Sequence, residues 1–118
     1  TVNAFLERGC DLLLDVEPRG ARAIKVRFPD GVFVFLLPPS IEALKRRLAR
    51  RGESPEAMET RLAKAKDEIR EAIWYDYLIV NDRIEQAEKQ LRSVYVAETC
   101  RRERFRHRME EELQSLIG

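Results

Sequence analysis

Three short apolar runs are separated by longer amphipathic segments along this chain. The runs are residues 11–16 (DLLLDV), 32–37 (VFVFLL) and 77–80 (YLIV), and most of their side chains are branched or aromatic. Runs of this length and composition are typical of strands that are buried on both faces. The proline, aspartate and glycine at 29–31 predict a turn before the second run. The pattern therefore predicts three short buried strands.

The segments around these strands have apolar residues at helical spacing and residues that cap helices, so they are predicted to be helical. Ser40 and Ser54 are good N-caps, and Pro55 suits the first position of the helix that follows. Gly9 suits the C-terminal cap of a first helix, and Gly52 breaks a later one. The predicted helices cover residues 2–8, 17–28, 41–51, 55 to about 73, and about 84 to 116.

Three of these helices carry one apolar face, which predicts that they pack against the strands. We expect these faces to be core rather than a cofactor site. Trp74 and Tyr75 are likewise expected to pack the end of a helix rather than to stack on a base. The residues of the apolar faces are Ile41, Leu44 and Leu48; Met58, Leu62, Ala65, Ile69 and Ile73; and Ala87, Leu91, Val94, Phe105 and Met109.

The order of elements predicts an α/β domain with a parallel sheet. Buried strands joined by helical crossovers pair in parallel, and their connections are right-handed. Ligands bind beyond the carboxyl ends of the strands in such sheets. Asp15, Glu17, the prolines at 38–39 and the pair at 81–82 fall at that edge. The long helical excursion at 38–76 is placed to act as a lid above it.

Arginine is concentrated at the break between the two helices of this excursion. Arg47 and Arg51 are four residues apart, so on a continuous helix they share a face, and Arg61 returns from the second helix. The planar guanidinium group suits phosphate because its donors grip two oxygens at once. The alternative is a solvated helical hairpin whose charges serve solubility.

Composition narrows the classes of function. The 118 residues carry 22 Lys+Arg against 21 Asp+Glu, a net charge of +1, which argues against non-specific nucleic-acid binding and polybasic membrane binding. The longest apolar run is too short to cross a bilayer. Cys10 and Cys100 have no metal-ligand spacing, and we expect reduced thiols in a cytoplasm. The chain begins at Thr1, which indicates a fragment.

The last part of the chain alternates in charge. Five arginines are followed by three glutamates at 110–112, and the sole histidine, His107, lies among them. We expect a solvated helix end with a solvated histidine; a basic patch for an anionic partner is the alternative. The five arginines are Arg101, Arg102, Arg104, Arg106 and Arg108.

Four strings of this sequence resemble guanylate kinases, of the nucleoside monophosphate kinase group. They are LLLDVEPRGAR at 12–22, FLLPPSIEALKRRLARRG at 35–52, RLAKAKDEI at 61–69 and YDYLIVND at 75–82, and the resemblance runs to about residue 96. It implies part of a P-loop NTPase-type fold with a parallel sheet, a helical lid and a long C-terminal helix. The implied division is core at 1–37 and 77–96, lid at about 40–75, and basic helical tail at 97–118.

The resemblance also implies an activity, the transfer of the γ-phosphoryl group of ATP to GMP with Mg²⁺. ATP and GMP are the implied partners, and the oligomeric state is left open. Arg47, Arg51 and Arg61 resemble the lid arginines, which clamp the transferring phosphate and are expected to be catalytic. Asn81 and Asp82 resemble the loop beside the adenosine of ATP.

Two acids resemble the GMP side of such a site. Asp15 matches the acid at the end of the Walker B-like strand, which organises Mg²⁺ through a water, and Glu17 matches the acid that contacts guanine. The family usually has Asp at the position of Glu17 and Gln at that of Arg19, and Pro18 is also unusual, so the guanine contact is less well matched than the lid. Asp15 as a helix cap and Asn81-Asp82 as a simple turn are the alternatives.

The phosphate-binding loop G-x-x-x-x-G-K-[ST] does not occur in these 118 residues. The resemblance therefore implies the carboxyl-terminal part of a guanylate kinase, which by itself does not turn over. A non-catalytic guanylate kinase-like module that binds a phosphorylated protein is the alternative function. A stable α/β subdomain with vestigial nucleotide contacts is the third.

Overall fold

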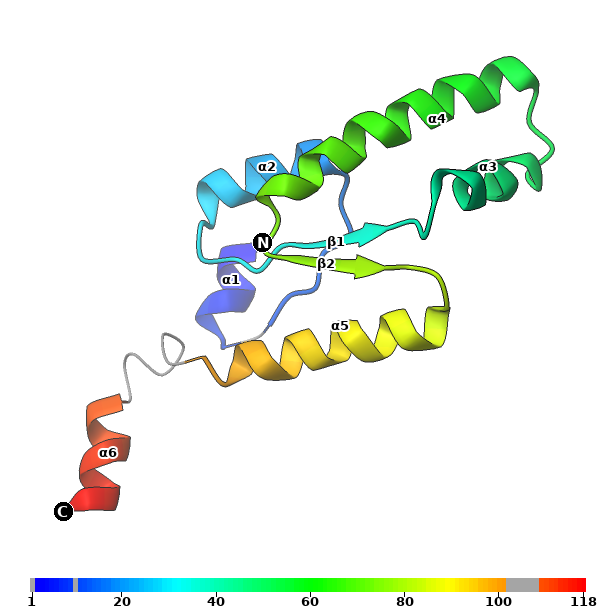
Figure 1. Cartoon of the computed structure of the whole chain (residues 1–118). Coiled ribbons are helices and arrows are strands. Elements are labelled where there is room, and N and C mark those ends of the chain that lie inside the picture. The colour runs from blue at the N-terminus through cyan, green and yellow to red at the C-terminus, as the bar shows by residue number, and fades with distance from the viewer. Residues whose placement is uncertain (1, 10, 102–108) are drawn as a thin grey trace.

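The computed structural model of the chain describes residues 2–9, 11–101 and 109–118 (Figure 1). Cys10, Phe105, His107 and the arginines at 102, 104, 106 and 108 lie outside the described residues, and so do the predictions made for them. The elements are α1 (Val2–Glu7), α2 (Pro18–Arg27), β1 (Val34–Leu37), α3 (Ile41–Ala49), α4 (Pro55–Arg70), the short 3₁₀ helix η1 (Glu71–Trp74), β2 (Tyr77–Val80), α5 (Ile84–Thr99) and α6 (Met109–Ile117).

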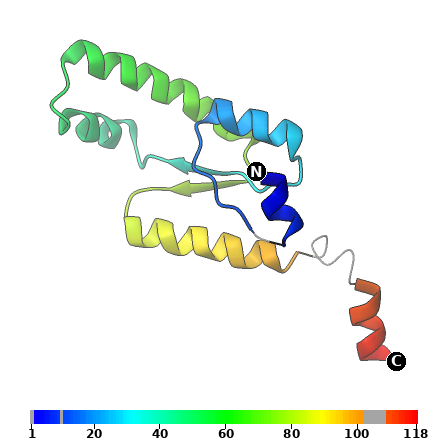
Figure 2. The same cartoon turned by 180° about the vertical axis from the view of Figure 1, so that it is seen from behind.

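The strands β1 and β2 pair in parallel, as predicted. Their register runs from Val34 opposite Tyr77 to Leu37 opposite Val80. The pairing extends beyond the strands, because the Asn81 amide donates to the Leu37 carbonyl at 2.7 Å. Helices α2 and α4 lie on one side of the strand pair and α5 on the other (Figures 1 and 2). This two-sided cover is the layered arrangement expected of a parallel α/β sheet.

The strand predicted at 11–16 is wrong for this chain. Residues 11–17, all within the described part, are extended but form no strand, and every one is exposed. Leu13 is 86% exposed. A strand exists only where a neighbour satisfies its backbone groups, and neither β1 nor β2 pairs with this segment. Tyr95 tethers it from α5, since its hydroxyl donates to Asp11 Oδ2 at 2.7 Å.

Capping chemistry starts the helices where the sequence predicts. The Ser40 hydroxyl accepts from the Ala43 amide at 3.0 Å, and the Ser54 hydroxyl accepts from the Ala57 amide at 3.2 Å. Each serine satisfies a backbone donor that the first turn of a helix leaves without an intrahelical partner. Between α3 and α4, Gly52 takes φ +70°, a left-handed conformation that favours glycine.

The single last helix predicted from about 84 to 116 is also wrong, because α5 ends at Thr99. The Thr99 hydroxyl donates to the Val96 carbonyl at 2.6 Å, and the amides of Cys100 and Arg101 donate to carbonyls three residues back. Three-residue hydrogen bonds tighten the last turn, which is a common way for a helix to end. Helices α5 and α6 are therefore two separate helices.

The buried apolar core is small. Among the stripe residues, Leu48 and Ala87 are buried, Met58, Leu62, Ala65 and Ile69 are half-buried, and Ile73 is 90% exposed, so the core prediction is wrong for Ile73. The accessible surface is 9945 Å², against roughly 6,600 Å² for a compact monomer of this mass. The buried apolar residues of the described part are Ala21, Phe33, Phe35, Ala43, Leu48, Ile79 and Ala87.

Aromatic packing closes the end of the sheet at which the strands begin. Trp74 meets Phe33 edge-to-face at 5.5 Å between ring centroids, and Tyr75 meets Phe35 at 4.9 Å, so both aromatics pack as predicted. Arg22 and the Trp74 indole donate to the same oxygen of Glu71. The hydrogen bonds from these two side chains, that from Arg22 above all, hold the pKa of Glu71 below its ordinary value.

No helix within the described parts of the chain combines the length and the apolar character needed to cross a membrane.

Candidate functional site

The candidate site lies at the carboxyl ends of β1 and β2. Helices α3 and α4, together with the turns on either side of them, form a helical arm at residues 38–76. This arm projects beyond the carboxyl ends of the strands (Figure 1). A cavity of about 210 Å³ lies where the arm leaves the sheet. Its polar lining comes from Arg47, Glu68 and Asn81, and its apolar lining includes Leu37, Pro38 and Leu44.

Arg47 joins the arm to the strand ends. Its Nη2 donates to the Asn81 carbonyl at 2.9 Å, in a partly buried contact between residues 34 positions apart. Ser40 fixes the start of α3 directly after β1, and this places Arg47 two turns later above the end of β2. Two predicted site residues are thereby brought together. A guanidinium group that binds through one nitrogen keeps its other donors for a second acceptor.

Arg51 and Arg61 have different surroundings. Because α3 ends at Ala49, Arg51 lies in the following turn, where it is exposed, and the shared helical face predicted for Arg47 and Arg51 does not form. Arg61 of α4 makes an ion pair with Glu53, 2.9 Å between Nε and Oε1. Of the three arginines, only Arg47 therefore contacts a predicted site residue through a described hydrogen bond.

The acidic residues predicted for the GMP side lie on the exposed segment before α2. Glu17 is the N-cap residue of α2 but makes no side-chain cap hydrogen bond. Its Oε1 instead lies 3.6 Å from Lys64 Nζ on α4. Asp15 is exposed two residues earlier, and Asp82 is exposed in the bend after β2. The contact with Lys64 connects the segment that carries both acids to the helical arm.

Three charged residues near this site were missed from the sequence: Glu53, Lys64 and Glu68. Lys64 and Glu68 form an i,i+4 pair at 4.0 Å, and that spacing on a predicted helix was a usable signal. Glu53 gave no such signal, because it lies in the turn before α4 and its pairing with Arg61 has no i,i+4 spacing.

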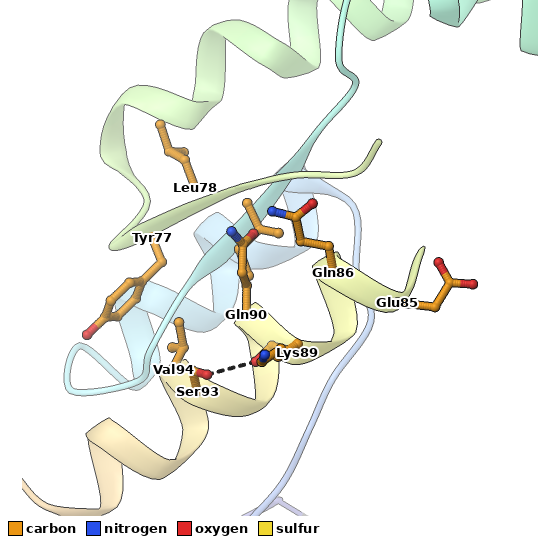
Figure 3. Close-up of a pocket in the computed structure, with 9 residues that line it drawn as sticks. Tyr77, Leu78, Glu85, Gln86, Lys89, Gln90, Ser93 and Val94 are labelled. Carbon is orange, nitrogen blue, oxygen red and sulfur yellow. Dashed lines mark hydrogen bonds between the residues drawn. The ribbon is translucent and has the colours of Figure 1, made fainter. Parts of the chain in front are cut away.

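A second hollow lies between β2 and α5 (Figure 3). Its volume is about 760 Å³, and its lining mixes apolar and polar side chains. No predicted site residue lines it, so it is separate from the site at the strand ends. Its lining residues are Tyr77, Leu78, Ile79, Glu85, Gln86, Lys89, Gln90, Ser93 and Val94.

A parallel strand pair with helices on both sides, and a helical arm beyond its carboxyl ends, defines an α/β protein of the class that binds ligands at that edge of the sheet. The family model for guanylate kinase matches residues 1–98. The chain belongs to the guanylate kinase family, which has the P-loop NTPase fold; the described strands and helices are consistent with part of that domain.

Curated relatives agree with this family. The guanylate kinase of Syntrophus aciditrophicus is 46% identical over 110 residues, which are 93% of this chain and 53% of the relative. Those of Geobacter sulfurreducens and Symbiobacterium thermophilum are each 50% identical, over 79% and 85% of this chain and 46% and 48% of their own lengths. The chain therefore spans about half the length of the curated relatives that it matches.

Proposed function

We propose that this chain supplies the lid and the strand-end half of an enzyme that transfers the γ-phosphoryl group of ATP to GMP, giving ADP and GDP. The observation that carries the proposal is the Arg47 to Asn81 hydrogen bond, in a chain of the guanylate kinase family. It ties a cation of the helical arm to the edge of the sheet where nucleotides bind.

Each predicted site residue has a role in this proposal. Arg47, Arg51 and Arg61 clamp the transferring phosphoryl group and neutralise the charge that grows in the transition state. Asn81 and Asp82 flank the adenosine of ATP. Asp15 and Glu17 face GMP, with Glu17 on its guanine. The proposed division is lid at about 40–75, core at 1–37 and 77–96, and tail at 97–118.

The proposed reaction also needs a phosphate-binding loop, which these 118 residues do not contain. None of the five glycines precedes a lysine, as the phosphate-binding loop requires. Since the chain spans about half of its relatives, we expect turnover only when the other half is present. The exposed apolar segment at 11–17 and the large accessible surface are consistent with a domain that is completed from elsewhere.

Mg²⁺ is part of the proposed reaction, with ATP. The described residues contain no cluster of three or more His, Cys, Asp or Glu side chains that would hold a metal ion. Mg²⁺ usually keeps several waters and binds substrate phosphates with only one or two carboxylates. Asp15 would hold it through a water. When bound, the ion supplies charge neutralisation on the phosphates.

The alternative is a non-catalytic module that binds a phosphorylated protein in the former substrate site. The curated relatives reported above are named guanylate kinases, so this alternative is not favoured. A cytoplasmic location goes with the enzymatic proposal.

The test is to join the chain to the N-terminal portion of the Syntrophus aciditrophicus relative that it does not cover. We expect ADP production from ATP and Mg²⁺ that depends on GMP, followed by a coupled spectrophotometric assay. The 118-residue chain without that portion is the control and should be inactive. A well-folded fusion that binds GMP but consumes no ATP would overturn the enzymatic proposal in favour of the binding module.

A further inference from the structure

The turn of the helical arm contains a carboxylate that the proposed chemistry does not explain. Glu53 lies between Gly52, at φ +70°, and Ser54, the N-cap of α4. Its side chain is only 16% exposed, although it sits at the tip of a solvated arm. A carboxylate is rarely shielded to this degree without a partner.

Arg61 is that partner. Glu53 Oε1 lies 2.9 Å from Nε of Arg61 on α4, while the Arg61 side chain remains 53% exposed. Glu53 Oε2 is shielded from solvent and accepts no hydrogen bond from the described part of the chain. The ion pair joins the carboxylate to the inner nitrogen of the guanidinium group, and in the described part of the chain no hydrogen bond or ion pair holds the two outer nitrogens.

We propose that Glu53 is a positioning residue, which fixes the Arg61 guanidinium so that its outer nitrogens are presented to the transferring phosphoryl group. The inference rests on the proposed function, in which Arg61 clamps that group. A long side chain that is already held in one rotamer loses less freedom when it binds. A shift of a clamp by about an ångström lowers the rate strongly while substrate binding changes little.

A purely structural pair would behave differently. If the pair only stabilised the turn, removal of the Glu53 charge would lower the melting temperature and leave the kinetics unchanged once the protein is folded. The measurement that separates the two roles is therefore the division of the effect between kcat and KM, and the environment of Arg61 tests whether the pair itself is present in solution.

The first measurement uses the 118-residue chain. The substitution Glu53→Gln keeps the shape of the side chain and removes its charge, and ¹⁵N NMR follows the Arg61 Nε–Hε signal. We expect this signal to shift in E53Q and to stay in place in E59Q, because Glu59 is an exposed residue of the same helix without an ion pair in the described structure. An unmoved Arg61 signal in E53Q overturns the inference, whatever the activity.

The second measurement uses the natural protein at the full length that its gene encodes. We expect E53Q to lower kcat roughly tenfold, with KM for GMP changed less than twofold and E59Q unchanged. R61A should lower kcat roughly 10³-fold, and E53Q in that background should cost nothing further, because Glu53 acts through Arg61.

The outcomes separate the inference from the reaction. An active protein in which E53Q keeps full kcat, or in which R61A does, overturns the inference and leaves the phosphoryl transfer standing. The inference is also overturned if E53Q lowers kcat in the R61A background by the same factor as in the unsubstituted protein. Absence of GMP-dependent turnover in the unsubstituted protein removes the proposed function and this inference together.

Discussion

Three arginines of the helical arm have different surroundings. Arg47 is half-buried and bound to the Asn81 carbonyl, Arg51 is exposed in a turn, and Arg61 is paired with Glu53. Sequence spacing selected all three as candidates, because arginine suits phosphate and these three surround one helix break. It did not predict their two partners, because Asn81 follows β2 and is distant from Arg47 in the sequence, and Glu53 lies in the turn before α4 without an i,i+4 spacing to Arg61.

At this scale we predict that Arg51→Ala lowers kcat far more than it weakens GMP binding. An exposed arginine at the tip of the arm has little ground-state role to lose, whereas a clamp acts on charge that exists only in the transition state. The expected loss in kcat is roughly 10³-fold. Steady-state kinetics of the completed enzyme with ATP and GMP measures both quantities.

Arg46→Ala is the matched control, because Arg46 is an exposed arginine on the last turn of α3. It should leave kcat within about twofold, as expected for a surface substitution away from the reacting atoms. If R51A raised KM for GMP as much as it lowered kcat, Arg51 would hold substrate and not the transition state.

The sequence predicted correctly the elements that depend on neighbouring residues. It failed for the strand at 11–16, which depends on pairing with another strand. The serine caps, the Gly52 break and the run before Pro38 predicted the arm and β1 well, because each acts within a few residues. The segment at 11–16 has the same apolar character as β1, yet it lacks a strand to pair with. The end of α5 at Thr99 was not predicted, because neither a proline nor a glycine directly follows it in the sequence.

Two glycines should respond in opposite directions to alanine. Gly52 at φ +70° is strained by any side chain, so Gly52→Ala should lower the free energy of unfolding by roughly 1 kcal/mol. Gly20 lies in α2, where an added Cβ meets only Val16 at an ordinary 3.6 Å, so Gly20→Ala should raise it by about 0.4–1 kcal/mol. Urea unfolding followed by circular dichroism measures both.

The two variants act as controls for each other, since they make the same chemical change at different backbone geometries. A neutral Gly52→Ala would mean that the turn of the arm does not require a left-handed residue.

The accessible surface of the molecule is larger than that of a compact chain of this mass, and large apolar side chains contribute to it. Leu12, Leu14 and Val16 are 37%, 47% and 45% exposed, on the segment that was predicted to be a buried strand. Residues scattered singly in this way are ordinary, but a contiguous run of them marks a surface that another structure covers. The apolar run at 11–16 predicted a buried strand, whereas its residues are exposed in the structure.

We predict that Leu13→Ala is nearly neutral in the 118-residue chain and destabilising in the completed enzyme. Leu13 is 86% exposed here, where truncation should change the free energy of unfolding by less than about 0.5 kcal/mol. If the completed enzyme buries this residue in a strand, the cost rises to roughly 2–5 kcal/mol. Urea unfolding of both proteins gives the comparison.

Val26→Ala is the matched control, because Val26 is also 86% exposed but lies on α2. It should be close to neutral in both proteins. An equally small effect of Leu13→Ala in the completed enzyme would show that the segment stays at the surface.

The strands β1 and β2 are joined by the whole helical arm, and contacts between them, such as that of Phe33 with Asp76, link residues 43 positions apart. Closing so long a loop by diffusion is entropically unfavourable, and pairings of this kind slow the formation of a native state. Helices α3 and α4, each started by its own serine, fold the intervening chain back on itself and shorten the gap. The hairpin of α3 and α4 would thus favour the pairing of β1 with β2, the only strand pair of the described residues.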